Sequence, residues 1–188
     1  MLRTRVGRQV AVVALMALAA AGSCMNAKAA GSTYLAPATA CPGQTAAGTP
    51  PAVEQRAMRC LVNWARRRRG VTPVRTSARL DRSAALRAEA IKQCGDFSHS
   101  PCGSPFGSVF AQVGYWRGRV AVGENLAWAD LPTSSPRDTV AGWLASPPHR
   151  HVLFMPSWRE GGIALLQAEG LFGHPRVAVW VSQFGRRG

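Results

Sequence analysis

Apolar residues recur at helical spacing in three stretches of the chain, and each stretch is bounded by residues that start or stop helices. Ser77 and Ser135 suit N-caps, Gly70 and Gly95 suit C-terminal stops, and Pro147 with Pro148 interrupts the third stretch. The apolar positions are Val53, Ala57, Leu61, Trp64 and Ala65, then Leu80, Ala84, Ala88 and Ile91, then Val140, Trp143 and Leu144. This pattern predicts three amphipathic helices.

The pattern changes toward the end of the chain. Residues 162–167 and 176–184 are rich in β-branched and aromatic residues, and a turn-rich connection at 169–175 separates them. Such segments are typical of two strands that form a hairpin. Because helices alternate irregularly with strands, we predict an α+β fold in which helices pack on an antiparallel sheet.

The first 51 residues differ in composition from the rest. A basic leader, an apolar run at 10–21 and the tripeptide Ala27-Lys28-Ala29 predict a secretory signal peptide over 1–29. An alternative is a lipoprotein signal, in which Cys24 would be acylated. Residues 30–51 are rich in Ala, Gly, Thr and Pro and predict a linker, so we expect the folded domain at 52–186.

Cleavage after residue 29 leaves four cysteines, and an even number in an exported chain favours disulfides over metal or catalytic thiols. Four cysteines allow three pairings. Cys94 and Cys102 lie close together in the sequence, and Cys41 can tie the N-terminal segment to Cys60 on the first helix. We therefore favour the pairs Cys41–Cys60 and Cys94–Cys102.

The exported chain is strongly basic. Of 23 Lys and Arg, four lie in the leader, which leaves 19 against 9 Asp and Glu, a net charge of +10. Outside the cell, this charge favours acidic wall polymers or anionic lipid head groups as partners, or simply solubility, and makes nucleic acid an unsuitable partner. We expect the protein to be secreted and monomeric.

One carboxylate lies in an apolar setting, within the sequence Gly123-Glu124-Asn125-Leu126-Ala127-Trp128. A charge withdrawn from water needs partners. His99 and His149 each follow the end of a predicted helix, so both imidazoles can reach a cleft shared with Glu124. We expect Asn125 to hold a turn through its amide.

Several short motifs occur in one order, which is more specific than any one of them alone. They are Phe97-Ser98-His99, Gly123 to Leu126, Trp143 followed by Ser146 to Arg150, Gly161-Gly162-Ile163, and Trp180 to Gly185. In these motifs, the chain resembles the bacterial branch of the CAP superfamily (cysteine-rich secretory proteins, antigen five and pathogenesis-related one proteins; SCP-like domain). The resemblance implies a three-layer α-β-α sandwich with a cleft at one side.

The resemblance also implies a site, because two His and two acidic residues line the family's cleft and hold a metal in some members. His99, Glu124 and His149 match three of them, and the second acidic position falls near Ser146, where no acid is present. These three residues could bind Zn²⁺ or another divalent metal, or shuttle protons. The alternative is purely structural, with Glu124 cross-linking the cleft wall.

Trp128, together with Tyr115 and Trp116, is the candidate apolar lining of that cleft. Three functions remain open at this stage. The first, which we favour, is a non-enzymatic secreted module that binds an apolar or cell-envelope ligand, since the resemblance implies sterol or lipid binding. The second is a metal-dependent secreted hydrolase of protease type, and the third is a basic cell-wall-associated protein.

Overall fold

The structure is a computed structural model that describes residues 33–188. Five helices and four strands form the domain. The helices are α2 (Pro51–Arg68), α3 (Ala78–Cys94), α4 (Ser108–Gln112), α5 (Pro136–Ala145) and α6 (Pro147–Phe154). The strands are β1 (Arg75–Thr76), β2 (Val120–Asp130), β3 (Glu160–Glu169) and β4 (Arg176–Arg187).

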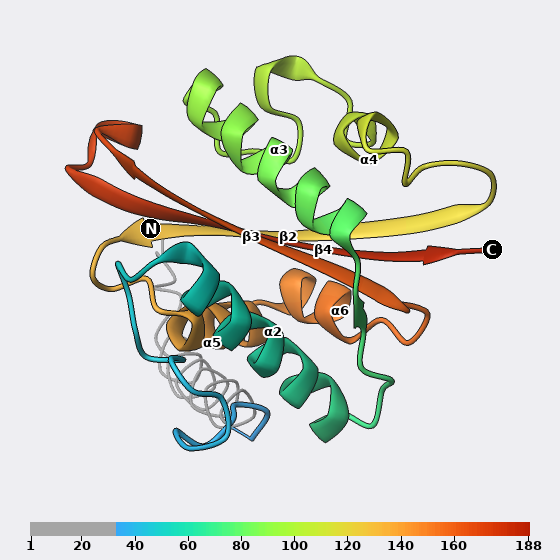
Figure 1. Cartoon of the computed structure of the whole chain (residues 1–188), viewed down its shortest axis with the longest axis horizontal. Coiled ribbons are helices and arrows are strands. Elements are labelled where there is room, and N and C mark those ends of the chain that lie inside the picture. The colour runs from blue at the N-terminus through green and yellow to red at the C-terminus, as the bar shows by residue number, and fades with distance from the viewer. Residues whose placement is uncertain (1–32) are drawn as a thin grey trace, which may run out of the picture.

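A single sheet forms the middle of three layers (Figure 1). Its strand order is β1-β3-β4-β2, with α3 and α4 on one face and α2, α5 and α6 on the other. The predicted α-β-α sandwich is therefore confirmed. The sheet is mixed rather than purely antiparallel, because the two-residue β1 pairs parallel with β3 while β2 and β3 both pair antiparallel with β4.

The helix signals act largely as predicted. Ser77 and Ser135 accept hydrogen bonds from backbone amides in the first turns of α3 and α5, and Gly95 ends α3 with a φ of 60°. One prediction was wrong in part. Pro147 and Pro148 do end α5, but they also form the first turn of a further helix, α6, where a missing N–H costs nothing.

Each face of the sheet buries its own apolar cluster. On the α3 face, Ala84, Ala88 and Ile91 pack against Leu126 and valines of β4. On the other face, Trp143, Trp158 and Trp180 are the largest side chains of the cluster beneath α2, α5 and α6. Of the predicted apolar positions of α2, Leu61 and Ala65 belong to this cluster and are at most 1% exposed.

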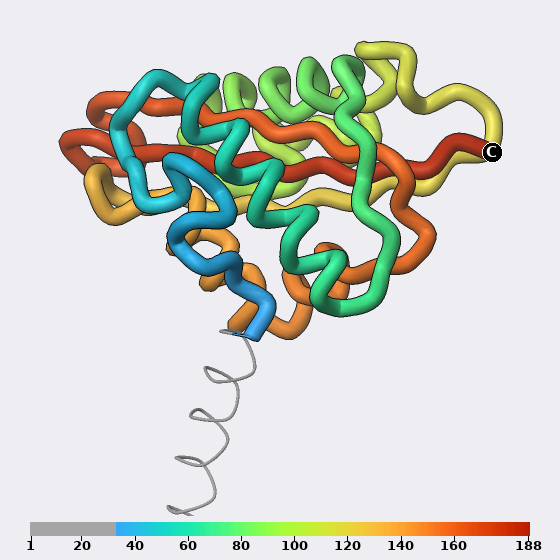
Figure 2. Tube along the Cα trace, turned by 60° about the horizontal axis from the view of Figure 1, so that its bottom comes forward, coloured from blue at the N-terminus to red at the C-terminus, as the bar shows by residue number. Residues whose placement is uncertain are grey.

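The structure contains both favoured disulfides, Cys41–Cys60 and Cys94–Cys102, with Cα–Cα distances of 5.6 and 5.5 Å. Residues 33–50, part of the predicted linker, pack on the domain, to which the Cys41–Cys60 disulfide ties them. Ala36 and Cys41 are fully buried, and Arg137 on α5 donates from its backbone N–H to Gln44 O at 2.8 Å. Figure 2 shows this blue segment alongside α2 and α5.

The predicted signal peptide at 1–29 and the alternative lipidation site at Cys24 lie outside the described residues. Within residues 33–188, none of the helices has the length and apolar character needed to cross a bilayer.

The backbone of α3 lies directly against the sheet at Gly162. A Cβ added to this residue would overlap the backbone atoms of Leu80 and Asp81, which cannot move without displacing the start of α3. We expect Gly162→Ala to lower the free energy of unfolding by about 3 kcal/mol or more. Chemical denaturation measures this loss.

Gly142→Ala is the matched control, because a Cβ at Gly142 on α5 would meet no atom within 4 Å. There the substitution should stabilise the protein by up to about 1 kcal/mol through helix propensity. Equal effects of the two substitutions would contradict this account of the α3–sheet contact.

Candidate functional site: a buried carboxylate beside an apolar groove

Glu124 lies near the middle of β2, and its side chain is completely buried. Three groups from different parts of the chain bond its two oxygens. The Arg87 Nε lies 3.2 Å from Oε2, and the Gln183 amide donates to the same oxygen at 2.7 Å. His99 Nδ1 lies 2.7 Å from Oε1, and since a carboxylate only accepts, this nitrogen is the donor. The charge of Glu124 is therefore paired and hydrogen-bonded.

Arg87 comes from α3, which covers the Glu124 face of the sheet (Figure 1). Its side chain is fully buried, and its Nη2 donates to Phe106 O at 2.6 Å. Gln183 lies on β4 directly opposite Glu124 in the antiparallel register. The carboxylate thus joins a helix, two strands and the loop that carries Phe106.

His99 reaches Glu124 from the loop after α3. Gly95 turns the chain out of the helix, and the Cys94–Cys102 disulfide closes a short loop around the histidine. The His99 side chain remains 51% exposed, so one face of the imidazole contacts solvent while Nδ1 holds the buried acid.

His149 approaches from the opposite face of the sheet, on the first turn of α6. Asn125, the neighbour of Glu124 on β2, points to this side and donates to His149 O at 3.0 Å. Asn125 is therefore a fully buried strand residue that holds α6 to the sheet, and the prediction that it holds a turn was wrong.

The two imidazoles are close enough to interact electrostatically. Burial lowers the pKa of His149, and the nearby His99 lowers it further. His149 Nδ1 forms a 2.8 Å hydrogen bond with Ser146 Oγ. The structure thus brings His99 and Glu124 into direct contact and places His149 across the edge strand β2.

An open groove of about 400 Å³ runs along β2 next to this group. Trp128 and His149 line it, whereas His99 and Glu124 do not. The groove residues come from the Phe97 loop, from β2 and the turn after it, and from α5 to α6. They are Phe97, Leu126, Ala127, Trp128, Ala129, Thr133, Ser134, Asp138, Thr139, Gly142, Trp143, Ser146 and His149.

Aromatic rings gather at the groove around Trp128. The ring centre of Phe97 lies 6.5 Å from that of Trp128, and the ring centre of Phe172 lies 5.0 Å from it. Phe97 is 37% exposed, one of two large apolar side chains so exposed in residues 33–188. The other is Trp116, which with Tyr115 lies away from the groove, so these two predicted lining residues have other positions.

The residues do not fit a metal site of the predicted kind. Both oxygens of Glu124 bond protein groups, and His99 Nδ1 and His149 Nδ1 are engaged as well. Two Nε2 atoms remain, fewer than the three protein ligands of catalytic zinc sites. Across the described part of the chain, no three His, Cys, Asp or Glu side chains are grouped to hold one metal ion.

Sequence reasoning missed Arg87 and Gln183, the partners that neutralise and hold Glu124. Arg87 carried a usable signal, because it falls on the inward face of its helix between Ala84 and Ile91. An arginine at such a position requires a buried acceptor. Gln183 carried no such signal, because its partner depends on the β2–β4 register.

Comparisons with known proteins agree with this geometry. The model of the cysteine-rich secretory protein family (CAP) matches residues 60–184. The chain therefore belongs to this family. The comparison with curated protein sequences gives no significant match.

Solved structures show the same fold at low sequence identity. An extracellular protein containing an SCP domain from Bacillus anthracis is 18% identical, with a TM-score of 0.58, over 73% of this chain and 41% of its own. An outer surface protein from Borrelia burgdorferi is 16% identical, with a TM-score of 0.60, over 72% and 93%. A cysteine-rich secretory protein from Staphylococcus aureus is 13% identical, with a TM-score of 0.56, over 74% and 41%. The chain thus spans well under half the length of the first and third proteins.

Replacing Glu124 by Gln should destabilise the fold, because it leaves Arg87 as an uncompensated charge at a fully buried position. Breaking such a pair costs about 3–5 kcal/mol of unfolding free energy. Urea denaturation measures the loss.

The control is Glu89→Gln, which removes an exposed carboxylate from α3, the same helix that carries Arg87. We expect a change within about 0.5 kcal/mol there. If Glu124→Gln were as mild as the control, Glu124 would not anchor the site.

Proposed function

We propose that this chain is an exported, non-catalytic binding module that holds an apolar ligand in the groove between β2 and α5. The main observation in support is the groove itself, which is lined by the aromatic side chains of Phe97 and Trp128. Its volume of about 400 Å³ lies within the range of small-molecule sites in proteins.

The groups in the groove suit a ligand with an apolar middle and polar ends. Leu126, Ala127 and Ala129 of β2 line it, together with Gly142 of α5. Polar side chains enter from Thr133, Ser134, Asp138 and Thr139 near the start of α5, and from Ser146 and His149 beyond its other end, where the Ser146 hydroxyl bonds the imidazole. A ligand with a hydroxyl or carbonyl at this end would find a hydrogen-bonding partner in His149.

The alternative of a metal-dependent hydrolase is less well supported. Glu124, its proposed base or ligand, does not line the groove and has both oxygens bonded to other side chains. Ser98, next to His99, donates to Asp96 Oδ2 at 2.9 Å and accepts from the Ser100 amide, so its hydroxyl stabilises the loop. These contacts favour an architectural role for the polar group.

Export is part of the proposal and has separate support. The leader at 1–29 predicts secretion, and both cysteine pairs are oxidised in the structure, as expected outside the cytoplasm. Relatives of the same fold include a protein described as extracellular and another described as an outer surface protein.

Filling the groove tests the proposal. In Gly142→Leu, the new side chain enters open space above β2, since nothing lies within 4 Å of an added Cβ. We expect the affinity for Nile red, a neutral apolar dye, to fall by about tenfold or more, because the Leu takes up volume needed by the ligand. Fluorescence titration gives both affinities.

Ala145→Leu is the matched control, because Ala145 is an exposed residue of the same helix that does not line the groove. It should leave the dye affinity within about twofold of the unchanged protein. Equal dye binding by all three proteins would reject the groove as the ligand site.

A further inference from the structure

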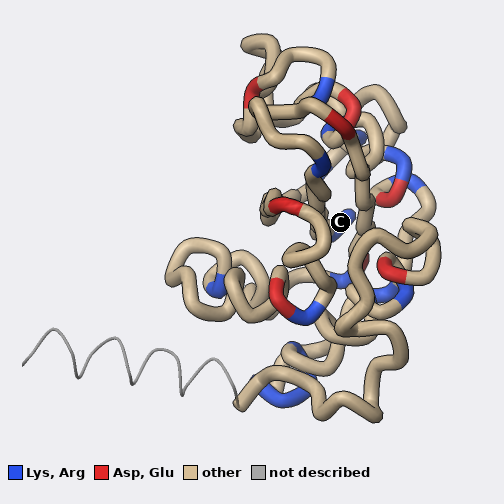
Figure 3. The backbone as a smooth tube through the Cα atoms, turned by 90° about the vertical axis from the view of Figure 1, so that its left-hand side faces the viewer, with Lys and Arg blue, Asp and Glu red and all other residues tan. Residues whose placement is uncertain are grey.

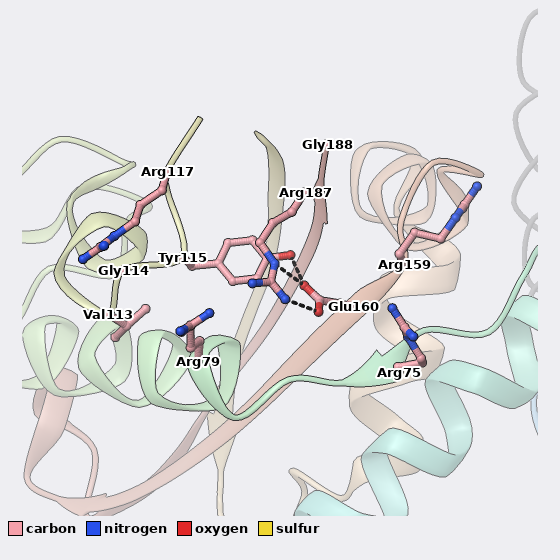
Figure 4. Close-up of a pocket in the computed structure, with 10 residues that line it drawn as sticks. All are labelled: Arg75, Arg79, Val113, Gly114, Tyr115, Arg117, Arg159, Glu160, Arg187 and Gly188. Atoms are coloured by element: carbon pink, nitrogen blue, oxygen red, sulfur yellow. Dashed lines mark hydrogen bonds and ion pairs between the residues drawn. The ribbon is translucent and has the colours of Figure 1, made fainter. Parts of the chain in front are cut away.

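A second hollow, of about 570 Å³, lies at the end of the sheet where β1 and β3 begin and β4 ends (Figure 4). It is not connected with the groove through any shared lining residue. Five arginines line it from five separate segments. They are Arg75, Arg79, Arg117, Arg159 and Arg187, and Glu160 is the single acidic residue among them.

The backbone brings these arginines together. Arg75 on β1 is paired in register with Glu160, and its amide donates to Arg159 O at 2.9 Å. Arg159 in turn donates from its amide to Gly185 O near the end of β4. Arg79 follows on the first turn of α3. The parallel pairing of the short β1 therefore places Arg75 beside Arg159 at the end of the sheet where β4 finishes with Arg187.

The charge of Glu160 is balanced by Arg187, and the Tyr115 hydroxyl also bonds its carboxylate. Arg187 Nη2 lies 2.7 Å from Oε1, and the Tyr115 hydroxyl donates to Oε2 at 2.6 Å. The hydrogen bonds from Arg187 are the largest cause that lowers the pKa of Glu160, so its carboxyl is ionised at neutral pH. The Arg187 guanidinium also lies 5.3 Å from the centre of the buried Tyr115 ring.

In the part of the chain that the structure describes, the other four cations form no direct ion pair with an acid, although Arg75 lies near enough to Glu160 to help lower the pKa of its carboxyl. Figure 4 draws Arg79 and Arg117 on one side of the Tyr115–Glu160–Arg187 group, and Arg75 and Arg159 on the other. Within residues 33–188, the side chains of Arg75, Arg79 and Arg117 form no hydrogen bond or ion pair. The Arg159 guanidinium donates only to the backbone carbonyls of Pro156 and Trp158. Among the lining side chains, five arginines against one carboxylate leave an excess of four positive charges.

The positive charge is denser in this hollow than the basic composition of the chain alone would give. Figure 3 shows acidic positions interspersed with basic ones over much of the molecule. In the hollow, several like charges line one space, and they repel one another most at low ionic strength, where salt screens least. An anion that enters the hollow relieves this repulsion and gains charge-assisted hydrogen bonds.

We propose that this hollow, the arginine pocket, binds a compact ligand that carries two linked phosphate groups. Guanidinium groups match phosphate oxygens in geometry and bind them in pairs of parallel hydrogen bonds. The four unpaired arginines lie on two sides of the pocket, which suits two phosphates better than one. The phosphates can belong to a soluble ester or to a lipid head group, since both present the same oxygens.

Isothermal titration calorimetry with sodium pyrophosphate tests the proposal at low ionic strength. The test variant is Arg79→Gln/Arg117→Gln, which removes two exposed arginines from the pocket. Its matched control is Arg67→Gln/Arg68→Gln, which removes two exposed arginines from the last turn of α2, outside the pocket. The two variants have the same net charge and differ only in where the charge was removed.

We expect pyrophosphate to bind the test variant at least about tenfold more weakly than the unchanged protein, and the control variant within about twofold. Orthophosphate should bind the unchanged protein more weakly than pyrophosphate. Absence of pyrophosphate binding, or equal losses in the two variants, would overturn the proposal, because overall charge would then explain any attraction.

Vesicles of phosphatidylcholine with cardiolipin, a lipid whose head group carries two linked phosphates, distinguish the two sources of phosphate. If the test variant loses affinity for pyrophosphate and for vesicles, the pocket binds head groups at a membrane. If it loses affinity for pyrophosphate alone, the pocket binds a soluble ligand. Retention of both affinities would overturn the proposal. None of these results depends on the apolar groove, which Nile red binding reports separately.

Discussion

The ion pair between Glu124 and Arg87 is the constraint on which the site depends. Both side chains are completely buried, so neither charge is tolerable without the other. The pair forms only if α3 lies over β2 in one register and at one rotation, because Arg87 occupies a single inward position of the helix. Gln183 and His99 then bond the remaining lone pairs of the carboxylate and fix β4 and the disulfide-closed loop to the same point.

The groove follows from the position of β2 at the edge of the sheet. An edge strand leaves polar backbone groups without a neighbouring strand, and here side chains replace that neighbour. Trp143 on α5 donates from its indole to Leu126 O at 3.0 Å. The indole therefore satisfies a backbone carbonyl of the edge strand. The groove beside it, which Phe97 and Trp128 also line, stays open. The groove arises because the sheet ends beside an ordered polar group.

The two candidate sites differ in chemistry: one suits apolar ligands and the other suits anions. The groove combines aromatic and aliphatic side chains with a few polar ones, whereas the arginine pocket lies at the other end of the strands and contains four cations that form no direct ion pair. This separation explains how a chain with 23 Lys and Arg against 9 Asp and Glu can combine an apolar groove with a basic surface. The composition shows the excess of arginine, but it does not show that five arginines gather in one pocket.

Local signals in the sequence were sufficient to predict much of the fold. Ser77, Gly95 and Ser135 bound helices where expected, and both cysteine pairs formed as favoured. The missed features depend on the pairing of distant segments. Asn125 resembles a turn residue in the sequence because its strand partner on β4 lies almost sixty residues away, and α6 was missed because two prolines stop one helix and also start the next.

The candidate site was predicted only in part for the same reason. His99 and Glu124 meet as expected, and Trp128 and His149 border the groove. The partners that decide the chemistry of Glu124, however, come from the register between β2 and β4 and from the rotation of α3. Without those partners the residues suggested metal ligands. With them, the carboxylate is an internal cross-link.

A double-mutant cycle on this cross-link tests the account most directly, using Glu124→Leu, Arg87→Met and their combination. We predict a coupling energy of at least about 2 kcal/mol, since the double variant buries no unpaired charge. The folded double variant should also retain Nile red binding. Single effects that add to within about 0.5 kcal/mol, or a stable double variant that no longer binds the dye, would contradict a purely architectural role for Glu124.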